Sequence, residues 1–92
     1  MIVTDEPGIY IENEYGIRTE NIVQVVKSEY EGFCKFDVLT LCHIDTRPIV
    51  REILTQSQID FVNDYNERVY KTLSPFLDEA EKAYLRERTK AI

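Results

Sequence analysis

The chain has 92 residues, which is enough for one small folding unit and too few for two full domains. Its formal net charge of −6 opposes the phosphate contacts on which nucleic-acid binding depends, and no cluster of lysine and arginine offsets it. No apolar run approaches the ~20 residues that a membrane-spanning helix needs. We therefore expect a folded chain with neither a nucleic-acid partner nor a membrane partner.

The first half of the chain has the pattern of β-strands. Short β-prone runs lie at 2–4, 8–11 and 22–30, and residues 36–41 alternate apolar and polar positions with a period of two. Glu31 and Gly32 mark a turn before the last of these runs. This pattern predicts antiparallel strands.

The segment TDEPGIYIENEYGIRTEN, residues 4–21, predicts a hairpin with a turn centred near Asn13. Paired positions in a hairpin have a constant sum of residue numbers, so the even-numbered residues share one face. The expected cross-strand pairs on that face are Glu6 with Glu20, Gly8 with Arg18, and Tyr10 with Gly16.

Two carboxylates placed opposite each other repel, so a positive charge is expected between Glu6 and Glu20. Arg18 can supply it as a salt bridge, or a hard divalent cation can take the carboxylate oxygens. Pro7 favours this second interpretation because it holds the preceding residue, Glu6, in an extended conformation. The alternative is a charged surface hairpin in which Glu6, Pro7 and Gly8 form an ordinary turn.

The second half has helical periodicity. Apolar residues spaced by three and four predict a helix over 56–73, with Thr55 and Gln58 as a capping box. Ser74 followed by Pro75 predicts the start of a second helix that runs to about Arg88. The apolar stripe of the first helix is Ile59, Val62, Tyr65, Val69 and Leu73. The apolar stripe of the second helix is Phe76, Leu77, Ala80, Ala83 and Tyr84. Residues 43–55 have no clear period and are expected to form a connecting arm.

Cys34, Cys42 and His43 have a spacing that matches no usual zinc site. We expect the two cysteines to be buried or half-buried thiols in a reducing compartment. We expect His43 to be a surface or packing residue.

EPGIY at 6–10 and GIRTEN at 16–21 resemble the last two metal-binding motifs of the pita-bread metallopeptidases of the M24 family, specifically aminopeptidase P. FDVLTLCHIDTRPI and the helical region after it resemble the C-terminal extension of the three-domain members. The resemblance implies an α+β fold, the C-terminal part of a pita-bread (creatinase/aminopeptidase) fold, with antiparallel strands followed by two helices. Residues 1–42 would be the last strands of the catalytic domain, and 43–92 the arm and helical extension, within one structural unit.

The resemblance also implies roles for particular residues. Glu6 would be a terminal metal ligand and a catalytic proton shuttle, Glu20 would bridge two metal ions, Arg18 would support the site, and Tyr10 would pack beside it. The cofactors would be two divalent ions, in the first instance manganese, with zinc or cobalt as alternatives. The family's other ligands, two aspartates and a histidine, would lie upstream of Met1, so tight metal binding and activity are not expected of this chain alone.

The implied activity of the parent protein is that of a cytoplasmic Xaa-Pro aminopeptidase, a hydrolase that removes an N-terminal residue preceding proline. The implied partners are a peptide with proline at its second position and a second copy, paired through the C-terminal region. Two alternatives stay open. The chain could be a non-catalytic dimerisation or interaction module, or a metal-free relative resembling creatinase.

Overall fold

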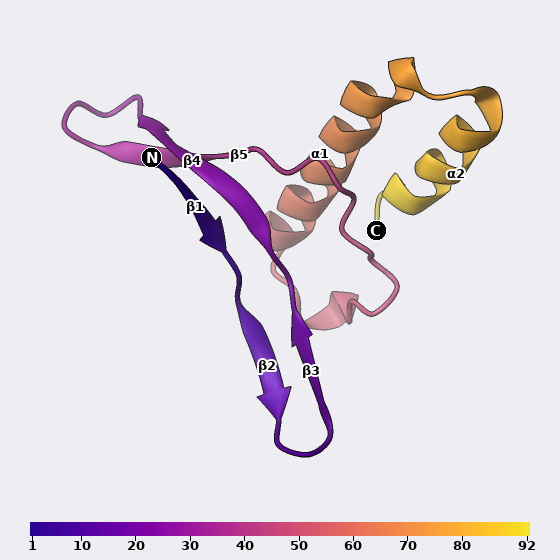
Figure 1. The fold of residues 1–92 in the computed structure, drawn as a ribbon, viewed down its shortest axis with the longest axis horizontal. Coiled ribbons are helices and arrows are strands. Elements are labelled where there is room, and N and C mark those ends of the chain that lie inside the picture. The colour runs from indigo at the N-terminus through magenta and orange to yellow at the C-terminus, as the bar shows by residue number, and fades with distance from the viewer. The chain divides into compact units, whose positions relative to one another are not determined.

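The computed structural model describes residues 1–92. The chain divides into two compact units, Met1–Thr40 and Leu41–Ile92, and each is described by itself. The first unit contains antiparallel strands and the second contains the two α-helices (Figure 1). The predicted α+β class is therefore confirmed.

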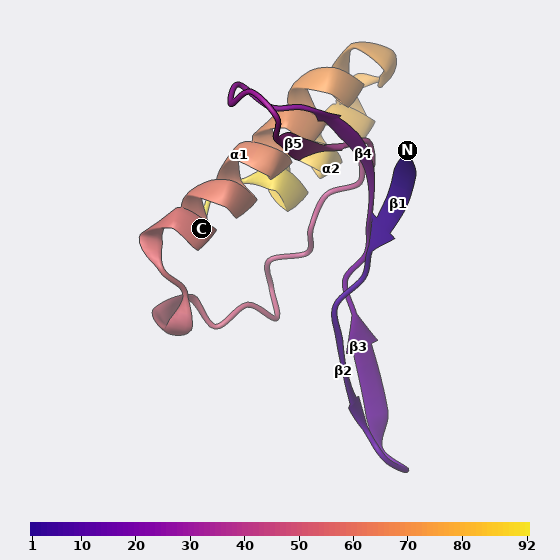
Figure 2. The same ribbon diagram turned by 90° about the vertical axis from the view of Figure 1, so that its left-hand side faces the viewer.

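Unit 1 holds five strands in two small sheets. β1, β4 and β5 form an antiparallel sheet in that order, with β4 in the middle, and β2 pairs with β3. Figure 2 shows that β1 leads into β2 and β3 into β4, so that these four strands form one long ribbon. The strands are β1 (Ile2–Asp5), β2 (Gly8–Ile11), β3 (Tyr15–Arg18), β4 (Asn21–Lys27) and β5 (Cys34–Val38).

The hairpin between β2 and β3 has the predicted register. Gly8 is paired with Arg18 and Tyr10 with Gly16. The turn centres on Asn13, which adopts a left-handed conformation with φ of 59°, a region that asparagine tolerates better than most residues. The Glu14 N–H donates to the Ile11 carbonyl over 3.1 Å and closes the turn.

β4 is shorter than predicted and β5 begins earlier. The expected strand ran to residue 30, but β4 ends at Lys27 because Ser28 starts a local turn. The Ser28 hydroxyl bonds to the Tyr30 backbone, and the Ser28 N–H donates to the Phe33 carbonyl over 3.1 Å. Gly32, at φ of 79°, completes the reversal as the predicted turn residue.

In unit 2, α1 (Gln56–Leu73) has the predicted bounds. Its capping box is present: the Thr55 side chain accepts from the Gln58 N–H, and the Gln58 side chain accepts from the Thr55 N–H. This arrangement satisfies two of the amide donors that a helix start leaves unpaired. The buried residues of the predicted stripe are Ile59, Tyr65 and Val69.

The predicted start of the second helix is wrong. Ser74 is the C-cap of α1 rather than the N-cap of a second helix, and its N–H donates to the Tyr70 carbonyl. It begins a single 3-10 turn, η2 (Ser74–Phe76), which ends at the extended residue Leu77. α2 (Glu79–Thr89) begins at Asp78, whose carboxylate accepts from the Glu81 N–H over 2.9 Å. The Glu81 carboxylate accepts from the Asp78 N–H in return, so the competing cap satisfies two donors.

The predicted apolar stripe of the second helix is also wrong. Phe76 is 84% exposed and Tyr84 is 59% exposed, whereas the buried residues of α2 are Leu85 and Thr89. Packing against α1 selects this face. Arg86 of α2 donates to the Glu67 carboxylate over 2.7 Å and lies 3.4 Å above the centre of the Tyr70 ring.

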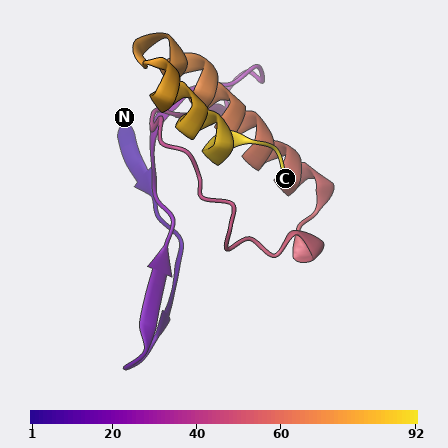
Figure 3. The ribbon, with the colours of Figure 1, turned by 90° about the vertical axis from the view of Figure 1, so that its right-hand side faces the viewer.

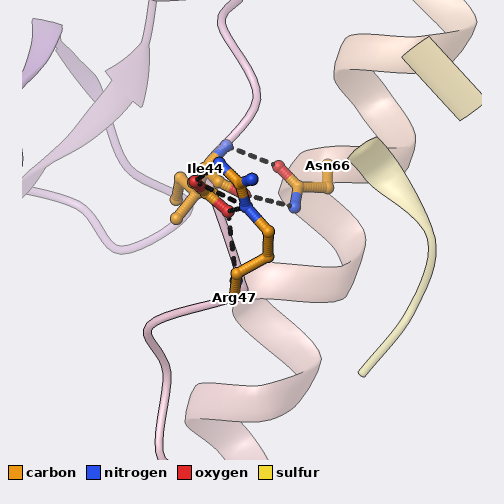
Figure 4. Close-up of polar contacts among 4 residues, drawn as sticks. Ile44, Arg47 and Asn66 are labelled. Carbon is orange, nitrogen blue, oxygen red and sulfur yellow. Dashed lines mark hydrogen bonds and ion pairs between the residues drawn. The ribbon is translucent and has the colours of Figure 1, made fainter. Parts of the chain in front are cut away.

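The arm before α1 has no regular secondary structure apart from a turn at 47–48 and one 3-10 turn, η1 (Arg51–Ile53) (Figure 3). The Ile49 N–H donates to the Thr46 carbonyl over 3.1 Å and closes the first of these turns. The buried Asn66 of α1 binds its backbone: Asn66 Oδ1 accepts from the Ile44 N–H over 2.8 Å and Asn66 Nδ2 donates to the Ile44 carbonyl over 3.1 Å (Figure 4). The Tyr65 hydroxyl donates to the Cys42 carbonyl over 3.0 Å. The side chain of Arg47 folds back onto Asp45, with a shortest contact of 2.6 Å.

Candidate metal centre on the hairpin

Glu6 and Glu20 lie between the two paired segments of the ribbon. Paired residue numbers add to 26 on both sides, at Asp5 with Asn21 and at Gly8 with Arg18. The Thr19 N–H donates to the Pro7 carbonyl over 3.1 Å, so the register is continuous across the gap. Glu6 therefore stands opposite Glu20, as predicted.

Arg18 lies on the same face as the two glutamates. Its Nε is 3.8 Å from Glu20 Oε2, and both side chains are about half exposed. The pKa of Arg18 is raised, first by a hydrogen bond and electrostatic interaction with Tyr10, and then by the charges of Glu6 and Glu20. One cation thus offsets two carboxylates, and the group has a net negative charge.

Tyr10 lies flat along this face, over two glycines. A Cβ atom at Gly16 would be 2.7 Å from Tyr10 Cδ1, and a Cβ atom at Gly8 would be 2.7 Å from the Tyr10 hydroxyl. Only glycine at both positions leaves room for the ring in this orientation. The phenol is thereby directed along the strand toward Arg18, which is paired with Gly8.

Thr4 is a member of this group that was not identified from the sequence. Its hydroxyl donates to Glu6 Oε2 over 2.6 Å. The signal that could have found it is its position two residues before Glu6, because residues i and i+2 of a strand share a face. One oxygen of the Glu6 carboxylate is therefore engaged by Thr4.

The donor set suits a hard divalent cation, but it is incomplete. Two carboxylates supply the oxygen ligands that such ions prefer. No group of three or more histidine, cysteine, aspartate or glutamate side chains in the chain is placed to hold a metal ion. Cys34 and Cys42 are unpaired and exposed, so the predicted burial of these thiols is wrong. His43 joins no metal-binding group. Glu6 and Glu20 therefore fit one part of a metal centre and do not complete it.

Residues 32–92 match the family model for the C-terminal region of peptidase_M24. The chain belongs to the M24 peptidase family. The hairpin precedes the matched residues, but matches to individual M24 relatives extend over it. The M24 chain has no helix long and apolar enough to cross a bilayer.

Three relatives illustrate the match. Xaa-Pro aminopeptidase ApepP of Drosophila melanogaster is 33% identical, over 100% of this chain and 17% of that protein. Aminopeptidase P1 of Arabidopsis thaliana is 33% identical, over 100% of this chain and 15% of that protein. The crystal structure of X-prolyl aminopeptidase from Caenorhabditis elegans, described as a cytosolic enzyme with a di-nuclear active site, matches with a TM-score of 0.88 at 32% identity.

That match covers 99% of this chain and 16% of the C. elegans chain. The M24 chain therefore spans about one sixth of the length of the relatives that it matches. The strands followed by helices are the part of the architecture that the two proteins share. The predicted C-terminal part of a pita-bread fold is confirmed by this likeness.

Proposed function

We propose that this chain is the C-terminal segment of a dinuclear-metal aminopeptidase that removes an N-terminal residue preceding proline. The observation that carries the proposal is the hairpin register, which sets Glu6 against Glu20 with Arg18 on the same face. The names of the relatives support the choice of substrate class, because they are Xaa-Pro aminopeptidases matched along the whole of this chain. In this proposal unit 1 ends the catalytic domain and unit 2 is its helical extension.

The contacts of the two glutamates support different roles for them. Thr4 engages Glu6 Oε2, which leaves Oε1 to bind a single metal ion as a terminal ligand. Glu20 has only the long contact of 3.8 Å to Arg18, which leaves its two oxygens available to bridge two ions. Arg18 limits the repulsion between the carboxylates, and the neighbouring Tyr10 phenol contributes to the raised pKa of Arg18. Glu6 is the residue that we propose to move a proton during the reaction.

Two divalent ions, when bound, would acidify a water molecule and polarise the amide carbonyl of the peptide. Carboxylate ligands favour manganese among the candidate ions, and zinc and cobalt are the alternatives. Two of the five ligands come from this chain, and the other three come from polypeptide outside residues 1–92. The chain alone is therefore expected to bind metal weakly and to be inactive.

The test uses a joined polypeptide, in which the part of the C. elegans enzyme upstream of the matched region is followed by residues 1–92. Manganese stoichiometry is measured by calorimetry, and cleavage is measured with a peptide that has proline at its second position. We expect the Glu20→Gln variant to lose metal and at least about 100-fold in cleavage rate, because a bridging carboxylate contacts both ions. Glu12→Gln, in the turn of the same hairpin, is the matched control and should change neither quantity.

Three outcomes separate the alternatives. Unchanged stoichiometry and cleavage in Glu20→Gln would refute Glu20 as a bridging ligand. A folded joined polypeptide that binds no metal would favour the metal-free, creatinase-like alternative. Cleavage of the peptide by residues 1–92 alone would contradict the proposed dependence on ligands from elsewhere.

We also propose that unit 2 contributes to a homodimer. Phe76 and Phe61 are 84% and 55% exposed, so each offers apolar surface that a second copy could cover. Unit 2 has nine acidic and eight basic residues, so two copies of it would repel each other little. Sedimentation equilibrium should show dimers of the 92-residue chain that Phe76→Ser weakens. A monomer at every concentration would leave unit 2 without this role.

A further inference from the structure

Thr4 is a neutral hydrogen-bond donor on the carboxylate face of the ribbon. Its hydroxyl donates to Glu6 Oε2 over 2.6 Å. The two residues are two positions apart in an extended segment, so their side chains leave the backbone on the same side. Thr4 belongs to β1, whereas Glu6 lies just beyond β1 and outside both sheets. The bond therefore ties the Glu6 carboxylate to a residue of the three-stranded sheet.

The backbone that carries Thr4 is held by its neighbours. Thr4 is paired with Ile22 of β4, the middle strand of this sheet. On the other side of β4, the Ile22 N–H donates to the Thr40 hydroxyl and the Ile22 carbonyl accepts from the Leu39 N–H, each over 2.8 Å. Thr4 is also β-branched, which restricts rotation about its χ1 angle. The Thr4 hydroxyl is thus presented from a backbone and a side chain that both have little freedom.

Glu6 and Glu20 have different neighbours at the equivalent position. Arg18 precedes Glu20 by two residues, as Thr4 precedes Glu6, and its Nε is 3.8 Å from Glu20 Oε2. A guanidinium only donates hydrogen bonds, so it stabilises a carboxylate that stays ionised. A hydroxyl both donates and accepts, so it can stay bonded to a carboxylate that gains a proton. Arg18 also acts on Glu6, but the hydrogen-bonded neighbour of Glu6 is Thr4.

We propose that Thr4 is a positioning residue for Glu6, whose hydroxyl holds Oε2 so that Oε1 alone is presented to a metal ion, and which stays bonded to Oε2 while Glu6 gains and loses a proton. The inference rests on the proposed function, because it deepens the roles of Glu6 as a terminal ligand and as the residue that moves a proton.

The bond between Thr4 and Glu6 reverses its direction during the proposed reaction. Thr4 donates to the ionised carboxylate, as in the structure. The oxygen of the attacking water bonds to the carbonyl carbon, and a proton of that water passes to Glu6 Oε2, whose new O–H donates to Thr4 Oγ1. The C–N bond then breaks and the proton passes to the nitrogen of the leaving amine, which restores the first arrangement.

Three variants isolate the hydroxyl of Thr4. Thr4→Val removes the hydroxyl and keeps both the shape of the side chain and its preference for a strand. Thr4→Ser keeps the hydroxyl and removes only the methyl group. Thr19→Val is the matched control, because it removes a hydroxyl beside Glu20 from the opposite face of the same ribbon.

The first measurement uses the 92-residue chain without metal. The three-bond NMR couplings between the Hα and Hβ protons of Glu6 report whether its χ1 angle is fixed in one rotamer. We expect fixed values in the wild type, Thr4→Ser and Thr19→Val, and values averaged over several rotamers in Thr4→Val. The urea midpoint should be the same in all four chains, because Thr4 and Thr19 are exposed. Wild-type couplings of Glu6 in Thr4→Val would overturn the proposal.

The second measurement uses the joined polypeptide described above. Replacement of a residue that orients a metal ligand lowers metal affinity or activity by about 10- to 100-fold. Calorimetry with manganese should therefore show a loss of this size in Thr4→Val for one of the two ions. At saturating manganese, Thr4→Val should lower kcat for the peptide by at least about tenfold and leave KM unchanged. Thr4→Ser should retain most of both quantities, and Thr19→Val should retain all of both.

Wild-type metal affinity and kcat in Thr4→Val would overturn the positioning role of Thr4. Equal losses in Thr4→Ser and Thr4→Val would also overturn it, because the methyl group would then be the cause. If the joined polypeptide of wild-type sequence binds no metal, the proposed function fails, and the Glu6 couplings still decide whether Thr4 orients Glu6. If it binds metal and cleaves the peptide equally well with Thr4→Val, the role of Thr4 alone fails.

Discussion

Replacement of Asn66 by alanine should destabilise unit 2 by more than its small loss of volume implies. The Asn66 side chain is 1% exposed and makes hydrogen bonds of 2.8 and 3.1 Å to the N–H and carbonyl of Ile44. Alanine leaves both backbone groups without that partner, at about 1 to 3 kcal/mol for each buried group. Because Ile44 is half-buried, water can relieve part of this cost, and we expect a total of about 2 to 4 kcal/mol.

The assay is urea unfolding of the 92-residue chain, followed by the helical circular dichroism signal at 222 nm, together with hydrogen exchange at the Ile44 amide. Asn63→Ala is the control, since Asn63 makes the same two kinds of bond, of 2.9 and 3.4 Å, with the backbone of Ile92. The backbone at Ile92 can turn into water when released, so this variant should lose less than about 1 kcal/mol. Equal losses in the two variants, or an Ile44 amide that exchanges as slowly as in the wild type, would refute the reasoning.

Two further predictions concern the hairpin face and the contact between the helices. Gly16→Ala should displace the exposed Tyr10 ring, because the new Cβ would lie 2.7 Å from it. The NMR chemical shifts of the Gly8 α-protons should then lose the displacement caused by the ring current. Unchanged chemical shifts would contradict the flat orientation of the ring. The hydrogen bond and charge of Arg86 lower the pKa of Glu67 in the folded chain below 4.5. The ionised Glu67 therefore stabilises the fold fully above that pH, and this contribution is lost as the pH falls through the lowered pKa of the folded state. Urea midpoints at pH 7 and pH 3 should therefore differ less in Arg86→Met than in the wild type, and an equal difference would exclude this pair as a contributor.

The sequence by itself determined the features that depend on neighbouring residues. The hairpin register follows from alternation and a turn residue, and this register sets Glu6 opposite Glu20. The bounds of α1 follow from a capping box and a period of three and four. In each case the decisive contacts join residues close in sequence or follow from a fixed register, so a local pattern contains the information.

Tertiary packing decided the rest. Ser74 and Asp78 both have the chemistry of a cap, and the buried face of α2 is selected by contacts such as that between Arg86 and Glu67, 19 residues apart. The bonds from Asn66 to Ile44 span 22 residues, and no pattern in the sequence indicates them. The candidate site likewise has one part that follows from local sequence and one part that depends on tertiary structure. Its two carboxylates were predicted from the chain, whereas the orientation of Tyr10 over the two glycines is visible only when the strands are paired, because it depends on the space between side chains of different strands.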